Sequence, residues 1–442
     1  MWSKQRNFVT ETTFLLYRHA RNAVTSRTGR STILYAGNFL IQIFIQFGYF
    51  LLMVRIFDVT GYGVFSSVTA ITFFLSNFVG WGCERVLIQR VSVKHEAFPE
   101  YFGHSILSIL FTAPIVFMIA YHVIESVAGG ALEPFALAAI ILADTICLKF
   151  AFLSGSSYMA FDKTKRHIII SIGMILVKIS TLAIAQFTIG GLTINDFAIW
   201  YFISSCLYAI FTIILVCYEL GYPRLRFFLS EWRLGLLFSL EYATLSGMRD
   251  LDKPIVLATL GAEASGYYAA AFRVVDAAAT PIMGLLYATY TGYFKNASAQ
   301  LSGGIGFGLR VLPYGLVLSA AISLFLLCAA GFLPLILGEQ FFDSVLLVKI
   351  LSVFPILRVA NGIGSDILRA INLQGIRVIF MIASTMLVMP GCWIGIKLGG
   401  LKGAVVSVMS INILIVLFVW IVIWRRSVQL AHCQKNYTKT ID

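Results

Sequence analysis

The sequence predicts an all-α polytopic membrane protein with about twelve transmembrane helices, arranged as two six-helix lobes that are related by a parallel repeat. Three observations lead to this fold class. Of the 442 residues, 59% are hydrophobic and 12% are charged, about half the charged fraction of an average soluble protein. Apolar runs long enough to cross a bilayer recur along the whole chain. A short glycine-containing pattern also occurs twice, 203 residues apart.

The apolar runs place the helices. A spanning helix needs about 20 mostly apolar residues, and a soluble fold of this size could not bury so much apolar surface. Seven uncharged runs have that length: 31–54, 59–83, 101–124, 197–218, 311–338, 378–396 and 403–424. Five further spans carry internal charges: about 134–154, 167–188, 235–260, 264–294 and 345–367. The residues between the spans are too few for a domain outside the membrane.

The positions of Lys and Arg predict the orientation. With the N-terminus in the cytoplasm, 23 of them fall in cytoplasmic segments and 3 in outer connections, as the positive-inside rule requires. Both termini are therefore expected to be cytoplasmic. We expect a cytoplasmic tail at 1–30, an N-lobe at 31–218, a linker at 219–233, a C-lobe at 234–425 and a second tail at 426–442. The linker contains Gly221, Pro223 and three Arg, so we expect it to carry few packing contacts.

Two connections between neighbouring spans are similar. Asp58-Val-Thr-Gly-Tyr-Gly63 joins the first two spans, and Gly261-Ala-Glu-Ala-Ser-Gly266 joins spans seven and eight. Six spans lie between the two copies, so equivalent helices cross the membrane in the same direction. This predicts a parallel repeat about an axis along the membrane normal, a plan found among transporters.

Three stretches resemble the polysaccharide (O-antigen type) flippases of the multidrug/oligosaccharidyl-lipid/polysaccharide exporter superfamily. They are Arg55-Ile-Phe-Asp-Val-Thr-Gly-Tyr-Gly-Val-Phe65 followed by Gly82-Cys-Glu-Arg85, then Asp252-Lys-Pro-Ile-Val-Leu through Gly266-Tyr-Tyr-Ala-Ala-Ala-Phe-Arg273, and Gly399-Gly-Leu-Lys-Gly-Ala404. The resemblance implies a multi-pass protein of a bacterial inner membrane that moves a lipid-linked oligosaccharide, carried on polyprenyl pyrophosphate, between leaflets. It also implies membrane lipids and a polysaccharide polymerase as partners.

Charged residues recur inside the predicted spans, where each costs about 2.5–3.5 kcal/mol at a helix centre. Arg249 and Asp252 lie three residues apart, as do Arg273 and Asp276, so each pair is expected to meet on one helix face. The resemblance implies a further contact between Asp252 and Arg273. The carboxylates expected to pair with cations or to couple transport to an ion are Asp144, Asp252 and Asp276. The alternative is that such pairs only neutralise each other and hold helices together.

The remaining cations predict a polar cavity. The candidate substrate-binding cations are Lys149, Lys178, Arg249, Lys253, Arg273 and Arg358. A pyrophosphate that leaves water needs counter-charge, and Arg forks onto phosphate oxygens. We therefore expect the head group to cross between the lobes while the polyprenyl tail stays in lipid, with the lobes rocking to open the cavity to each side in turn.

Other function classes fit less well. A drug or metabolite exporter of the same superfamily is the main alternative, with Asp144 or Asp252 as its coupling acid. A membrane glycan polymerase is a weaker one, because each outer connection is short. The six His form no metal-binding motif and no ATP-binding motif occurs. We expect no enzymatic activity, catalytic residue, cofactor or metal, and no nucleic-acid partner, because the cations are scattered between apolar segments.

Overall fold

The computed structural model describes residues 27–299 and 303–439, and the regular structure in these ranges is helical. Residues 1–26 of the predicted N-terminal tail lie outside the described residues. The first group of helices, here called the N-terminal bundle, consists of α2 (Arg27–Ser76), α3 (Cys83–Val91), α4 (Phe98–Ala128), α5 (Pro134–Leu142), α6 (Leu148–Ala160), α7 (Thr164–Ile189) and α8 (Ile194–Leu220).

The second group, the C-terminal bundle, follows an extended segment. It consists of α9 (Trp232–Asp250), α10 (Asp252–Leu260), α11 (Ala262–Ala278), α12 (Thr280–Ala299), α13 (Gly303–Ala329), α14 (Leu333–Leu337), α15 (Ser344–Leu351), α16 (Phe354–Ala370) and α17 (Gln374–Lys439). Eight helices in the described part of the chain are long and apolar enough to cross a membrane, or nine if the bent pair α11 and α12 forms one span. The chain is therefore a multi-pass membrane protein, and the count of twelve spans stays a prediction.

Two of the long helices change direction at a non-helical point. In α17 the break is at Gly399 and Gly400. Its two arms then pack against each other, because the Ser407 hydroxyl donates to the Gly391 carbonyl at 2.5 Å. In α2 the break is at Asp58. The break at Asp58 (φ 57°, ψ −174°) has nearly the same backbone shape as Gly261 (φ 88°, ψ 178°) between α10 and α11.

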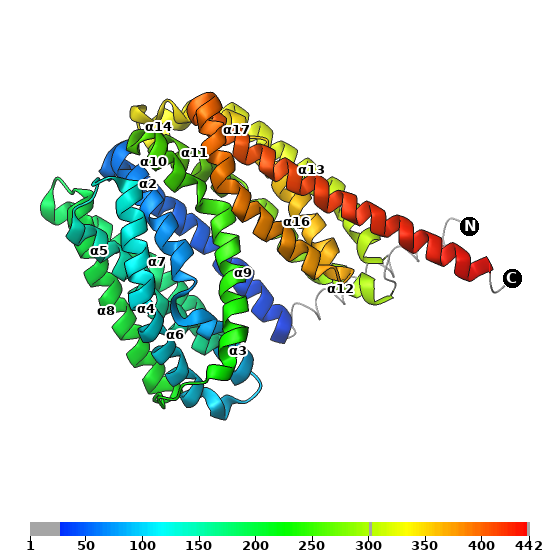
Figure 1. Cartoon of the computed structure of the whole chain (residues 1–442), viewed down its shortest axis with the longest axis horizontal. Helices are drawn as coiled ribbons and strands as arrows, with labels where there is room; N and C mark the ends of the chain where they lie inside the picture. Colours follow the sequence, from blue (N-terminus) through cyan, green and yellow to red (C-terminus); the bar gives the residue numbers. More distant parts are fainter. Residues whose placement is uncertain (1–26, 300–302, 440–442) are drawn as a thin grey trace, which may run out of the picture.

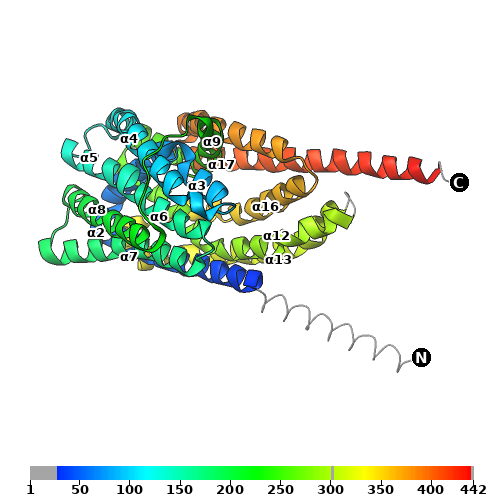
Figure 2. The ribbon, with the colours of Figure 1, turned by 90° about the horizontal axis from the view of Figure 1, so that it is seen from below.

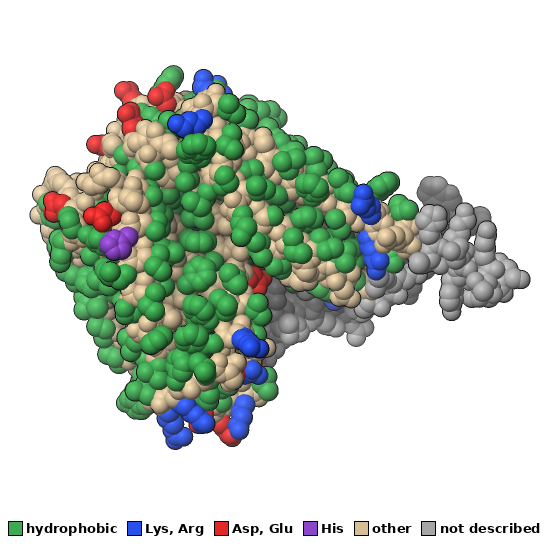
Figure 3. Space-filling model, in the orientation of Figure 1, with side chains coloured by type: hydrophobic (Ala, Val, Ile, Leu, Met, Phe, Trp, Pro, Cys, Tyr) green, Lys and Arg blue, Asp and Glu red, His purple; other side chains and the backbone are tan. Residues whose placement is uncertain are grey.

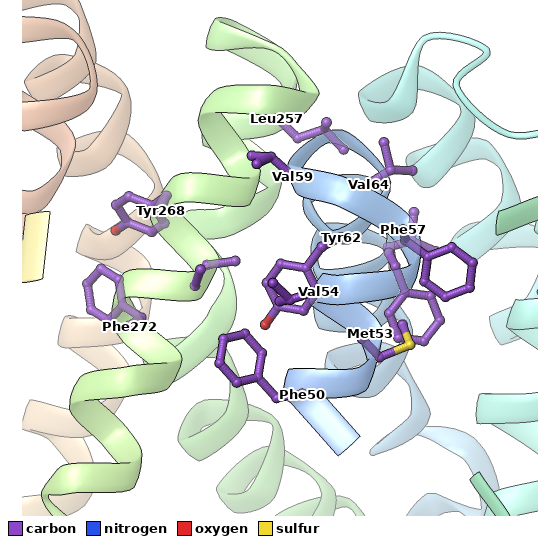
Figure 4. Packing of buried hydrophobic residues seen from close by; sticks show 14 of the residues in the cluster. Phe50, Met53, Val54, Phe57, Val59, Tyr62, Val64, Leu257, Tyr268 and Phe272 are labelled. Atoms are coloured by element: carbon purple, nitrogen blue, oxygen red, sulfur yellow. The ribbon is translucent and has the colours of Figure 1, made fainter. Parts of the chain in front are cut away.

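The two bundles meet at one end and diverge toward the other (Figures 1 and 2). Where they meet, α2 packs against α10 and α11 in one continuous hydrophobic core. Figure 4 shows Phe50, Val54 and Tyr62 of α2 facing the helices that carry Leu257 and Phe272. This contact surface between α2 and α11 is called the seam below.

Glycine allows the closest approach in the seam. A Cβ at Gly63 would overlap the carbonyl oxygen of Ala262, and a Cβ at Gly266 would overlap the carbonyl oxygen of Val59. Gly63 and Gly266 are equivalent in the predicted repeat, and so are Val59 and Ala262. The predicted repeat therefore relates the Gly63–Ala262 contact to the Gly266–Val59 contact. A side-chain hydrogen bond at 2.8 Å between the hydroxyls of Ser67 and Ser265 lies in the same seam.

Charge is distributed unevenly over the surface (Figure 3). Asp and Glu gather at the end where the bundles meet, here called the acidic end. Lys and Arg gather at the far ends of both bundles, here called the basic end. The helices between these ends expose mainly hydrophobic side chains, among them Phe111, Phe211 and Leu335. A surface of this kind fits lipid tails between two polar interfaces.

The connection between the bundles is docked onto the N-terminal bundle. The Arg224 amide donates to the Pro99 carbonyl at 2.8 Å, and the Phe228 amide donates to His104 at 3.3 Å. The Phe228 ring also stacks on Tyr101, with centroids 4.9 Å apart. These contacts hold the linker to α4, although most of its side chains, including those of Tyr222 and Phe227, are exposed.

Candidate functional site

A break between α9 and α10 brings three charges together. α9 ends at Asp250 and α10 begins at Asp252. Within this turn the Arg249 guanidinium pairs with Asp250 at 2.8 Å, and the Lys253 ammonium also pairs with Asp250. The predicted pair of Arg249 with Asp252 is not formed, because the chain leaves the helical path between them. Arg249 keeps 56% of its side chain exposed.

A second ion pair joins α11 to α16. The Arg358 guanidinium contacts the Asp276 carboxylate at 2.7 Å, and both side chains are about three-quarters buried. The predicted pair of Arg273 with Asp276 is therefore wrong, since Asp276 faces the neighbouring helix. Arg273 instead donates to the side-chain oxygen of Gln46 in α2 at 3.4 Å and so reaches the N-terminal bundle.

These six residues form what we call the central charge cluster: Arg249, Asp250, Lys253, Arg273, Asp276 and Arg358. Asp276 acts electrostatically on Arg249. Arg273, Lys253 and Asp250 all act on the phenol of Tyr62 in α2. Four cations and two carboxylates give the cluster a formal charge of +2, so the cluster favours an anion over a cation.

Asp252 borders this cluster and acts electrostatically on Lys253, but its carboxylate has another partner. It is 2% exposed, and its carboxylate accepts a hydrogen bond from the Tyr268 hydroxyl at 2.6 Å. The contact between Asp252 and Arg273 that the resemblance implied is not formed. Tyr268, five residues before Arg273 on α11, takes that place.

The N-terminal bundle holds a smaller polar group around Asp144. This carboxylate accepts hydrogen bonds from Thr72 at 2.6 Å and Tyr201 at 2.5 Å. The Lys178 ammonium lies over the Tyr201 ring, 5.0 Å from its centroid. Asp144 sits in a five-residue π-helical turn at Ala143–Cys147. Such turns widen a helix and are frequent at functional sites.

Lys149 is buried in an ion pair rather than open to a cavity. It is 7% exposed, and its ammonium contacts the Glu84 carboxylate at 2.6 Å. The sequence did not predict this partner, because Glu84 directly follows an apolar run and was expected in a cytoplasmic loop. The structure turns the chain back at Gly80, Trp81 and Gly82, which all have positive φ, and α3 then carries Glu84 into the bundle.

Sequence reasoning also missed the contacts between bundles near the basic end. The Arg85 guanidinium lies 4.4 Å from the ring centroid of Tyr242 in α9. Arg90 forms two 3.0 Å hydrogen bonds with Glu231, which raise the pKa of Arg90 and keep it charged. The first turns of α9 are thus attached to α3 of the N-terminal bundle.

Similarity to known proteins shows the family of this chain. A family described as "Polysaccharide biosynthesis protein" matches residues 28–290, more than half of the chain. The chain belongs to this family. No curated protein matches the chain.

Solved structures show the fold of this chain. An inward-facing multidrug resistance MATE family transporter of the MOP superfamily is 14% identical, with a TM-score of 0.74 over 87% of this chain and 95% of that chain. An outward-facing MATE transporter is 16% identical, with a TM-score of 0.62 over 93% and 98%. A MOP superfamily transporter from Pyrococcus furiosus is 15% identical, with a TM-score of 0.62 over 93% and 98%. The chain therefore has a MATE-like fold.

The arrangement holds no recognisable metal site. Among the described residues, no group of three or more His, Cys, Asp or Glu is placed to bind a metal ion. What the site offers is a set of fixed cations beside two buried carboxylates, Asp144 and Asp252, each hydrogen-bonded by a tyrosine. Such groups can bind anions and hold or release protons.

Proposed function

We propose that this protein is a flippase. It moves a polyprenyl-pyrophosphate-linked oligosaccharide from the cytoplasmic to the outer leaflet of a bacterial inner membrane, for the biosynthesis of O-antigen, capsule or exopolysaccharide. The observation that carries the proposal is the central charge cluster. Four cations against two carboxylates supply counter-charge for a pyrophosphate, and membership of a polysaccharide biosynthesis family makes a glycan-related substrate the natural cargo.

The cluster lies in the C-terminal bundle and faces α2 of the N-terminal bundle. Arg273 donates to Gln46 of α2, and Lys253 and Asp250 act electrostatically on Tyr62 of the same helix. Arg249 and Arg358 retain exposed side-chain surface. A pyrophosphate bound here would contact both bundles at once, so its passage would depend on their relative position.

We further propose transport by alternating access. The two bundles act as six-helix lobes, with both termini and the basic end cytoplasmic and the acidic end outside. Closure at the acidic end and the higher TM-score to the inward-facing relative both support a cavity that opens to the cytoplasm. Asp144 and Asp252 are the candidate ion-coupling carboxylates, and a polysaccharide polymerase is the proposed recipient of the flipped glycan.

The test is complementation of a deletion strain. Lipid-linked glycan is extracted, identified by mass spectrometry and assigned to a leaflet with a membrane-impermeant reagent. The wild-type gene should keep the cytoplasmic pool small, and the variant Arg249→Gln/Arg358→Gln/Asp276→Asn should make undecaprenyl-linked repeat units accumulate on the cytoplasmic face. Replacing Asp276 together with Arg358 avoids leaving a buried carboxylate unpaired.

Arg310→Gln is the matched control, because Arg310 is exposed and donates only to a carbonyl of its own helix. It should complement fully. A deletion strain with a normal glycan pool and normal surface polysaccharide would overturn the proposal.

A drug or metabolite exporter remains the second candidate function. Asp144 favours it, because a buried carboxylate held by Thr72 and Tyr201 is suited to ion coupling, and the inward-facing and outward-facing relatives are described as multidrug resistance transporters. In that case deletion would raise susceptibility to cationic drugs and leave the lipid-linked glycan pool unchanged. For a glycan flippase, deletion would instead enlarge the lipid-linked glycan pool and leave the susceptibility to cationic drugs unchanged.

A further inference from the structure

A buried arginine without a partner lies outside the central charge cluster. Arg377 is 7% exposed. Its Nε and Nη1 atoms are buried and have no hydrogen-bond partner among the residues that the structure describes. A guanidinium presents five N–H donors in a fixed fork, and a buried unpaired charge is strongly unfavourable. We therefore expect an anion to accept hydrogen bonds from these free donors.

The surroundings of Arg377 hold a second arginine in place. Arg369 of α16 donates to Asp366 at 2.8 Å, and its guanidinium lies 5.6 Å from the ring centroid of Tyr290 in α12. The charged groups that act on Arg377 are Arg369, Asp366 and Glu241 of α9. Asp366 is already engaged by Arg369. Glu241 acts on Arg377 without forming an ion pair with it in the described part of the chain.

The helix that carries Arg377 adds to the positive field. α17 begins at Gln374, so Arg377 is in its first turn, and no acidic residue occupies that turn. The first N–H groups of a helix lack partners in the helix and attract anions. The start of α17 is also uncrowded, because a side chain at Gly375, two residues before Arg377, would meet no atom within 4 Å.

The other bundle provides an internal comparison. The turn between α6 and α7 has the same backbone as the turn between α16 and α17, with Asp162 and Asn372 both in the left-handed region. His167 occupies the position equivalent to Arg377 and contacts the Gly155 carbonyl at 3.0 Å. Only one copy of this turn therefore combines a buried cation with free donors.

We propose that Arg377, with Arg369 beside it, binds the phosphate group of an anionic lipid at the basic end of the C-terminal bundle. Basic pockets between membrane helices are suited to such head groups. The phosphate has two possible sources, the pyrophosphate of the cargo or the head group of a membrane phospholipid, and the first of these rests on the proposed function.

The test uses the full-length protein purified in detergent and two short-chain probes, a polyprenyl pyrophosphate without sugars and phosphatidylglycerol. Affinity is measured by microscale thermophoresis and stability by the melting temperature. Arg377→Met should weaken binding of at least one probe by about tenfold or more, and Arg377→Lys should weaken it less. Arg310→Gln removes the same charge from the surface of the same bundle and should leave both affinities unchanged.

A stability measurement guards against misfolding. Arg377→Met should raise the melting temperature of the lipid-free protein, because it removes a buried unpaired charge. The same variant should abolish the further rise that the probe produces in the wild type.

Loss of polyprenyl pyrophosphate binding alone would assign the site to the cargo. Loss of phosphatidylglycerol binding alone would assign it to membrane phospholipid, and this result would stand even if the deletion strain showed no glycan defect. Unchanged affinity for both probes in Arg377→Met would overturn the site, even if the flippase proposal were supported by the glycan pool.

Discussion

At the scale of single residues, two of the interior ion pairs join different helices. Asp276 pairs with Arg358 of another helix, and Lys149 pairs with Glu84. The sequence predicted that charges in apolar spans must be paired or solvated, because isolated charges are too costly in a membrane. It could not predict the partners, because spacing along one helix says nothing about which residues of other helices lie opposite.

The Lys149–Glu84 pair makes a quantitative prediction. Lys149→Met leaves a buried carboxylate without its cation, which should destabilise the protein by about 3–5 kcal/mol. The double variant Lys149→Met/Glu84→Gln should recover most of that loss. The free energy of unfolding is measured by titration with denaturing detergent. Arg226→Gln is the comparison, since its pair with Glu100 is largely exposed and should contribute about 0–1 kcal/mol. Equal stability of all three variants would contradict the buried pair.

At the scale of elements, breaks in helices position the site. Residues 235–260 were expected as one span, but the chain forms α9 and α10 with Leu251 between them. Pro254 in the first turn of α10 is a sequence signal for that break, because a proline cannot donate the backbone hydrogen bond that a continuous helix would need. The turn at Asp58 and its counterpart at Gly261 were predictable, because both lie between apolar runs and both copies share a glycine pattern. The fold was thus easier to predict than the geometry of the charges.

The glycines of the seam predict an effect on conformation. Gly63→Ala places a methyl group against the Ala262 carbonyl, and overpacking of this kind costs about 1–3 kcal/mol. The closed acidic end should therefore open more often. A cysteine at Ser265 would report this as faster labelling by a membrane-impermeant maleimide in whole cells. Gly48→Ala is the control on the same helix, because a Cβ there meets no atom within 4 Å. Equal labelling in the two variants would show that the contact does not hold the seam closed.

At the scale of the whole molecule, the bundles are joined unequally at their two ends. The acidic end is closed by α2 and α11, whereas at the basic end of the described chain the connection and the first turns of α9 contact the N-terminal bundle. Rocking of the bundles would therefore require the seam to separate. The orientation expected from the positive-inside rule stays a prediction.

The seam can be locked to test this requirement. The hydroxyls of Ser67 and Ser265 are 2.8 Å apart, so cysteines at both positions should form a disulfide under mild oxidation. Cross-linked protein should fail to clear the cytoplasmic glycan pool, and reduction should restore transport. Ser67→Cys alone should be active under both conditions. Full transport by quantitatively cross-linked protein would show that the bundles need not part at this surface.

The reciprocal contact of Gly63 and Gly266 has a consequence for how the two halves of the chain can change. Each half supplies both the small residue and the carbonyl that the other half packs against, which is the arrangement of an isologous interface in a symmetric dimer. A larger residue in one half can be accommodated only by a change in the other. At other equivalent positions the two halves carry different residues, as His167 and Arg377 do after the two similar turns. At the seam the two halves pack against each other as the subunits of a symmetric dimer do, although a linker joins them in one chain.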